Sequence, residues 1–112
     1  AHGSACTVRF LENHDEPRCA EAFPEPRRRA AAAVVATLPG TWLFHHGQEH
    51  GHRIRVPVTL AKGGREPLDP AERARWRPLL ALKRHPAVRD GAWRQLPTSG
   101  WPGNPSHRDL LC

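Results

Sequence analysis

The chain has 112 residues, which is enough for one small domain with a modest hydrophobic core. Twelve prolines, nine glycines and only 38% hydrophobic residues argue that this chain is marginally stable when alone. The formal net charge is +6, but the arginines are scattered and no aromatic residues are interleaved with them, so nucleic acid is a disfavoured partner. The longest apolar run, residues 30–36, is too short to span a membrane.

The first half of the chain predicts a strand, a helix and a second strand. Residues 7–11 are β-branched and aromatic, which favours a short strand. An Ala- and Arg-rich helix is expected over residues 27–38, because Pro39-Gly40 closes it, and a second strand over residues 41–44. Strand, helix and strand at this spacing predict a βαβ unit with parallel strands, whose polar ends meet at one edge of the sheet. Functional sites of α/β folds are built at that edge.

The second half predicts one more helix and then loops. Asp69-Pro70 is a helix start, apolar positions recur at helical spacing as far as the stem of Lys83, and Pro86 ends the helix. Asp90-Gly91 is typical of a hairpin turn between short strands. The tryptophans in predicted elements, at positions 42, 76 and 93, are interpreted as packing residues.

Asn13, His14 and Asp15 follow the first strand directly. Polar side chains buried at the carboxyl end of a strand cost free energy unless they bind a ligand or hydrogen-bond to each other. A carboxylate there can stabilise a developing positive charge, and an imidazole can donate to a substrate hydroxyl. The alternative is a turn in which Asn13 and Asp15 bond the local backbone.

A histidine-rich cluster follows the second strand, with His45, His46, Glu49, His50 and His52. Imidazoles beside a carboxylate suggest zinc, but the spacing is not H-E-x-x-H and glycines interrupt any helix that would align the ligands. No metal site is therefore assigned. The three cysteines, at positions 6, 19 and 112, are odd in number and lack C-x-x-C spacing, so we interpret them as reduced thiols.

Two segments together resemble a known family. FLENHDEPR, residues 10–18, resembles the F-x-x-N-H-D segment at the end of the seventh barrel strand in glycoside hydrolase family 13, the α-amylase superfamily. LPGTWLFHHGQE, residues 38–49, is similar to the segment in which that family's eighth strand runs into G-x-E. The order matches the family, and the resemblance covers residues 7–60 firmly and the remainder loosely.

The resemblance implies a fold and a domain organisation. The fold class is α/β, as part of a (β/α)8 TIM barrel. Residues 1–87 would supply the last two strand–helix units of the barrel, and residues 88–112 the start of a C-terminal β-sandwich domain. Both ends of the chain look cut, so we expect a fragment of a longer enzyme that needs the rest of the barrel.

The resemblance also implies site residues. Asp15 matches the acidic residue that stabilises an oxocarbenium-like transition state, and His14 matches the histidine that bonds hydroxyls of the same sugar. Asn13 and Arg18 are assigned to substrate binding, and Glu49 is a secondary, structural candidate. The family commonly has tyrosine where this chain has His46.

The expected activity is that of a retaining glycosidase or transglucosidase on α-glucans or maltooligosaccharides. Such an enzyme needs a carboxylate nucleophile and a separate acid. The family's G-x-R-x-D segment and its acid glutamate are absent from this sequence, so the fragment alone should be inactive.

No cofactor is expected; many full-length relatives carry calcium, but no complete calcium site is matched here. The unpaired cysteines and the lack of a leader favour a cytoplasmic over a secreted location. The alternatives are a small basic nucleic-acid-binding module and a His-rich metal-binding module, neither catalytic.

Overall fold

The computed structural model describes residues 7–60 and 64–111. Strands β1 (Val8–Arg9) and β2 (Thr41–Trp42) pair in parallel, with Val8 opposite Thr41 and Arg9 opposite Trp42. Helix α2 (Glu25–Thr37) lies between the two strands in sequence and starts two residues before its predicted position. The prediction of a parallel βαβ unit is confirmed, although each strand is only two residues long.

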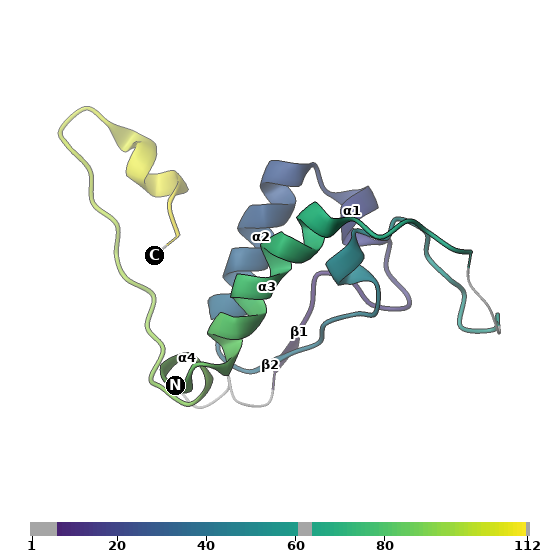
Figure 1. Ribbon diagram of the computed structural model, residues 1–112. Coiled ribbons are helices and arrows are strands. Elements are labelled where there is room, and N and C mark those ends of the chain that lie inside the picture. Colours follow the sequence, from purple (N-terminus) through teal and green to yellow (C-terminus); the bar gives the residue numbers. More distant parts are fainter. Residues whose placement is uncertain (1–6, 61–63, 112) are drawn as a thin grey trace.

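The other elements are all helical. They are α1 (Cys19–Ala22), the 3-10 helix η1 (Gln48–His50), α3 (Pro70–Arg84), α4 (Pro86–Arg89) and the 3-10 helix η2 (Pro105–Asp109). Figure 1 shows α2 and α3 side by side, with β1 and β2 beneath them. None of the described helices has the length and apolar character needed to cross a membrane.

The expected fold class is wrong. Residues 7–60 and 64–111 are mostly helical around one two-stranded sheet, and they contain neither barrel units nor a β-sandwich. A barrel closes through a run of neighbouring strands, about eight in a TIM barrel, whereas here α3 is followed by more helix and loop. The expected domain boundary between residues 87 and 88 falls inside α4 and stays a prediction.

The hairpin expected around Asp90-Gly91 is also wrong. His85 caps α4 by accepting a hydrogen bond from the Ala87 amide, so residues 86–89 are helical. Gly91 then follows the helix, where a Cβ atom would lie 2.1 Å from the Ala87 carbonyl oxygen. The Asp-Gly pair therefore marks a helix end, because glycine tolerates close backbone approach there.

Beyond α4 the chain runs away from the helices as an extended segment (Figure 1). The radius of gyration is 16.5 Å, whereas a compact domain of this length has about 13 Å. Trp93, which was predicted to pack, is half exposed on this segment.

Helix α3 begins and ends as predicted. The Asp69 carboxylate accepts hydrogen bonds from the amides of Ala71 and Glu72, at 2.8 and 3.2 Å, and satisfies two donors that the first turn leaves free. Near the other end, Lys83 Nζ donates to the carbonyl of Leu38, which caps α2, at 2.7 Å. This bond ties the carboxyl ends of α2 and α3 together, and burial lowers the pKa of Lys83, with Arg9 acting in the same direction.

The core lies between the sheet and these two helices. Trp76 of α3 packs with Cys19 and Ala32, and aromatic rings from β2 and the residues after it surround the indole. The ring centroids of Trp76 lie 6.2 Å from Trp42 and 5.3 Å from Phe44. The packing interpretation of Trp42 and Trp76 is confirmed, and their contacts fix where β2 ends relative to α3.

Candidate functional site

Two loops meet at the carboxyl ends of the parallel strands. One is residues 10–18, after β1, and the other is residues 43–52, after β2. Arg18 joins them: its Nη2 atom donates to the carbonyl of His46 at 2.9 Å and its Nε atom donates to the carbonyl of His52 at 3.3 Å. The edge predicted to carry the site is therefore where the two polar segments come together.

A buried ion pair holds the first loop in shape. Arg18 Nη2 lies 3.0 Å from Glu12 Oε1, and these side chains are 5% and 0% exposed. The contact is an ion pair without hydrogen-bond alignment, since Glu12 Oε1 has no hydrogen-bond partner among the described residues. Glu12 Oε2 accepts a hydrogen bond from the amide of Cys19 at 2.6 Å, at the start of α1. A buried carboxylate needs both partners, because an unpaired charge in the interior is costly.

Cys19 is free and buried in the core. Burial raises the pKa of its thiol to about 12, and the Glu12 carboxylate acts in the same direction. A thiol of this kind is a packing group and no nucleophile. The other two cysteines lie outside the described residues.

Asn13 forms the turn that the sequence left open as an alternative. Its Oδ1 atom accepts hydrogen bonds from the amides of Asp15 and Glu16, at 2.8 and 2.9 Å. This Asx turn reverses the chain directly after β1 and presents His14 and Asp15 outward. Asn13 thereby acts on the conformation of the loop.

His14 and Asp15 lie together on the surface. His14 Nε2 is 3.2 Å from Asp15 Oδ2, and the side chains are 57% and 77% exposed. From the loop after η1, Arg55 Nη1 donates to the carbonyl of Asp15 at 2.7 Å. The carboxylate and the imidazole are thus side by side and open to a ligand. The backbone of this turn is held by Asn13 through the amides and by Arg55 through the Asp15 carbonyl.

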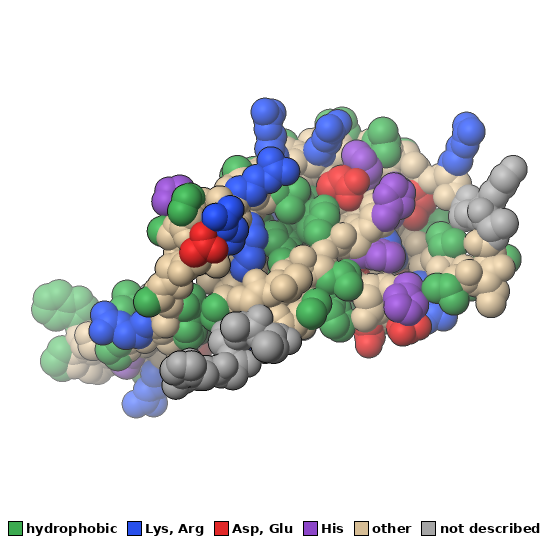
Figure 2. Space-filling view, turned by 90° about the horizontal axis from the view of Figure 1, so that it is seen from below, with side chains coloured by type: hydrophobic (Ala, Val, Ile, Leu, Met, Phe, Trp, Pro, Cys, Tyr) green, Lys and Arg blue, Asp and Glu red, His purple; other side chains and the backbone are tan. Residues whose placement is uncertain are grey.

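The histidines after β2 lie on the neighbouring loop. His45 is close enough to His14 for the two imidazoles to act on each other electrostatically, and the rings of His46 and His52 are 6.4 Å apart. Burial lowers the pKa of His45, and the Arg18 guanidinium adds to the effect. In Figure 2 histidine and acidic side chains gather on the right-hand part of the visible face.

Glycines shape this second loop. Gly47 and Gly51 have φ angles of 83° and 68°, which favour glycine, and they flank η1. A Cβ atom on Gly47 would lie 2.2 Å from the His52 ring, and one on Gly51 would lie 2.9 Å from the Glu72 side chain. Glu49 lies within η1 with its Oε1 atom 3.5 Å from His50 Nε2. Across residues 7–60 and 64–111, no group of three or more His, Cys, Asp or Glu side chains is arranged to hold a metal ion.

Sequence reasoning missed Glu12 and Gln48. Gln48 is 1% exposed, and its Oε1 atom accepts a hydrogen bond from the amide of His45 at 3.2 Å. The available signal for Glu12 was weak: a carboxylate next to an apolar strand, with an arginine six positions later. Both residues fix the conformation of their loops, and the spacing of motif residues in the sequence does not predict that role.

Comparison with known proteins gives one partial likeness. The chain is 44% identical over 46 residues to the α-amylase MalA of Haloarcula japonica. The matched stretch is 41% of this chain and 7% of that α-amylase. No protein-family model matches the chain, and no solved structure matches it. The chain is thus similar to a small part of an α-amylase.

Proposed function

We propose that this chain belongs to a glycoside hydrolase family 13 enzyme that acts on α-glucosidic bonds with retention, by hydrolysis or glucosyl transfer. The observation that carries the proposal is the exposed His14–Asp15 pair at the carboxyl end of β1, within a segment that resembles the family's F-x-x-N-H-D. The similarity of the chain to part of an α-amylase supports the same conclusion.

Asp15 is the proposed transition-state stabiliser. A pyranose ring gains positive charge as the glycosidic bond breaks, and a carboxylate held beside the ring lowers the energy of that state. In this proposal His14, whose Nε2 atom is 3.2 Å from Asp15 Oδ2, donates to hydroxyls of the same sugar. The substrate would be an α-glucan or a maltooligosaccharide.

Asn13 and Arg18 have positioning roles in this proposal. The Arg18 guanidinium is occupied by Glu12 and by the carbonyls of the second loop, so it acts on the sugar through the loop it holds. Asn13 forms the Asx turn from which His14 and Asp15 point outward. Glu49 serves the second loop, on the wall of a neighbouring pocket.

Retention needs a nucleophilic carboxylate and an acid that this chain does not supply in the family's segments. The 112-residue chain should therefore show no turnover of starch or maltooligosaccharides. Measurable hydrolysis by this chain alone, abolished by Asp15→Asn, would contradict the assignment of the missing acids to other parts of the protein.

The decisive test is made in the enzyme that contains this chain. Asp15→Asn should lower kcat on maltooligosaccharides by about 10²–10³-fold, which is the usual loss when one electrostatic contact to a transition state is removed. Glu16→Gln is the matched control, because Glu16 is an exposed neighbouring acid, and it should leave kcat nearly unchanged. Equal losses in the two variants, with circular dichroism unchanged, would reject the role of Asp15.

A further inference from the structure

Residues 53–55 follow the second loop and are held by two carboxylates. The Glu66 carboxylate accepts hydrogen bonds from the amides of Arg53 and Ile54, at 2.7 and 3.0 Å. The Arg53 side chain pairs with Glu21 of α1, with 3.1 Å between Nε and Oε2. The bonded residues are at least 12 positions apart in the sequence, so these contacts fix where the segment lies relative to distant parts of the chain.

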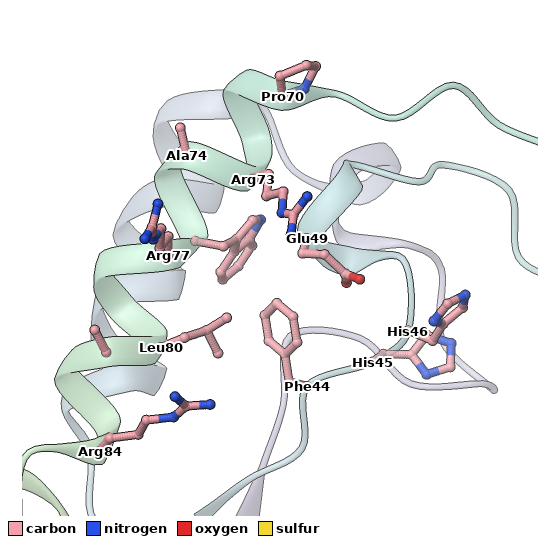
Figure 3. A pocket seen from close by; sticks show the side chains of 12 residues that line it. Phe44, His45, His46, Glu49, Pro70, Arg73, Ala74, Arg77, Leu80 and Arg84 are labelled. Atoms are coloured by element: carbon pink, nitrogen blue, oxygen red, sulfur yellow. The ribbon is translucent and has the colours of Figure 1, made fainter.

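The segment begins where the two loops of the candidate site meet. Arg18 Nε donates to the carbonyl of His52, the last residue of the second loop, at 3.3 Å. Figure 3 shows His45 and His46 of the same loop directed away from α3. His45 is also close enough to His14 for the two rings to interact electrostatically. Residues 53–55 therefore leave the second loop beside the candidate site.

Arg55 completes the hydrogen bonding of the Asp15 main chain. Its Nη1 atom donates to the Asp15 carbonyl at 2.7 Å, and the Asp15 amide donates to Asn13 Oδ1 at 2.8 Å. One of these bonds lies within the turn, and the other comes from a residue 40 positions away. Both polar groups of the Asp15 main chain are thus bound, which restricts the directions that its side chain can take.

We propose that Arg55 is a positioning residue for the reaction and holds the Asp15 carboxylate in place through the Asp15 main chain. The role of Arg55 rests on the proposed function, in which Asp15 stabilises the transition state. Such stabilisation requires that the carboxylate already lies where positive charge develops. A displacement of about 1 Å can lower a rate by about 10²-fold. Arg55 lies outside the two segments that resemble the family, residues 10–18 and 38–49.

The test is made in the enzyme that contains this chain, with maltooligosaccharides as substrate. Arg55→Met should lower kcat by about tenfold and leave KM within about twofold, because the lost interaction acts in the transition state. Arg55→Lys keeps a donor and should recover part of kcat. The matched control is Arg65→Met, since Arg65 is an exposed arginine with no side-chain hydrogen bond or ion pair among the described residues. The control should leave kcat nearly unchanged.

A double variant shows whether Arg55 acts through Asp15. In the Asp15→Asn enzyme, Arg55→Met should lower kcat further by less than about twofold, because the carboxylate that Arg55 positions is already gone. A further loss of about tenfold in the double variant, equal to the loss from Arg55→Met alone, would mean that the two residues act independently and would overturn the positioning role.

Amide hydrogen exchange measures the turn independently of catalysis. Arg55→Met should speed exchange in the peptide that covers residues 10–18 by about threefold or more, whereas Arg65→Met should leave it unchanged. Unchanged exchange in Arg55→Met overturns the positioning role, and a large loss of kcat in Asp15→Asn would then still support the proposed function. If Asp15→Asn leaves kcat unchanged, the proposed function fails, and the positioning role of Arg55 fails with it even where exchange is faster.

Discussion

Two parts of the molecule treat the same kinds of side chain in different ways. In the core between the sheet, α2 and α3, Trp76 is 3% exposed and packs with Cys19 and Ala32. In the C-terminal stretch, residues 90–111, Trp101 is 83% exposed. The apolar residues Trp93, Leu96, Leu110 and Leu111 of this stretch are exposed as well. Apolar composition alone therefore does not make a core.

The difference comes from backbone periodicity. Helix α3 repeats its apolar side chains at helical spacing, so Trp76, Leu79 and Leu80 reach one partner surface. Residues 97–105 contain three prolines and two glycines, which prevent a regular element and leave each apolar side chain without neighbours at a fixed spacing. Matched substitutions in the two parts can test this contrast.

The largest contrast is expected between Trp76→Ala and Trp101→Ala. Removing the Trp76 indole leaves a cavity beside Cys19 and Ala32 and should lower the free energy of unfolding by about 3–5 kcal/mol, enough to unfold a marginal domain. Trp101→Ala should change it by less than about 0.5 kcal/mol. Urea unfolding followed by circular dichroism measures both, and similar losses would show that the C-terminal stretch packs in solution.

A somewhat smaller contrast is expected between Arg18→Met and Arg94→Met. Arg18→Met leaves the Glu12 carboxylate buried without its cation and should lower the free energy of unfolding by about 3 kcal/mol. Adding Glu12→Gln to Arg18→Met should recover part of this loss, because the unpaired charge is gone. Arg94 is exposed, and Arg94→Met should be nearly neutral. If the double variant is less stable than Arg18→Met, the burial cost of Glu12 is not the cause.

Local signals predicted elements better than architecture. The start of α3 followed from Asp69-Pro70, and the parallel pairing of β1 and β2 followed from the spacing of strand, helix and strand. The barrel and the β-sandwich came from resemblance, and they require strands that residues 7–60 and 64–111 do not form. The hairpin failed because the same Asp-Gly pair also suits a helix end, and the capping bond from Ala87 to His85 decides between the two.

Sequence predicted the location of the candidate site and missed its support. His14 and Asp15 lie at the carboxyl end of β1 as expected, beside the loop of His45 and His46. Arg18 was assigned to substrate binding, yet its guanidinium is buried against Glu12. Spacing identifies residues that follow a strand, but it does not tell which of them turn inward, since that depends on contacts between distant loops such as the bond from Arg18 to His46.

The smallest and most specific contrast concerns pH, and it compares His45 with His107 of the C-terminal stretch. Burial, with the Arg18 guanidinium adding to it, lowers the pKa of His45 in the folded chain below its ordinary value of 6.5. Between these two pKa values the unfolded chain binds more protons, so the free energy of unfolding rises with pH. The stability is fully present above about pH 6.5 and is lost as pH falls toward the folded pKa. His45→Gln should therefore flatten the dependence of the urea midpoint on pH below 6.5, whereas His107→Gln should keep the slope of the parent chain. If His45→Gln leaves the slope of the urea midpoint against pH unchanged, other groups cause the loss of stability in acid, and the burial of His45 does not contribute to it.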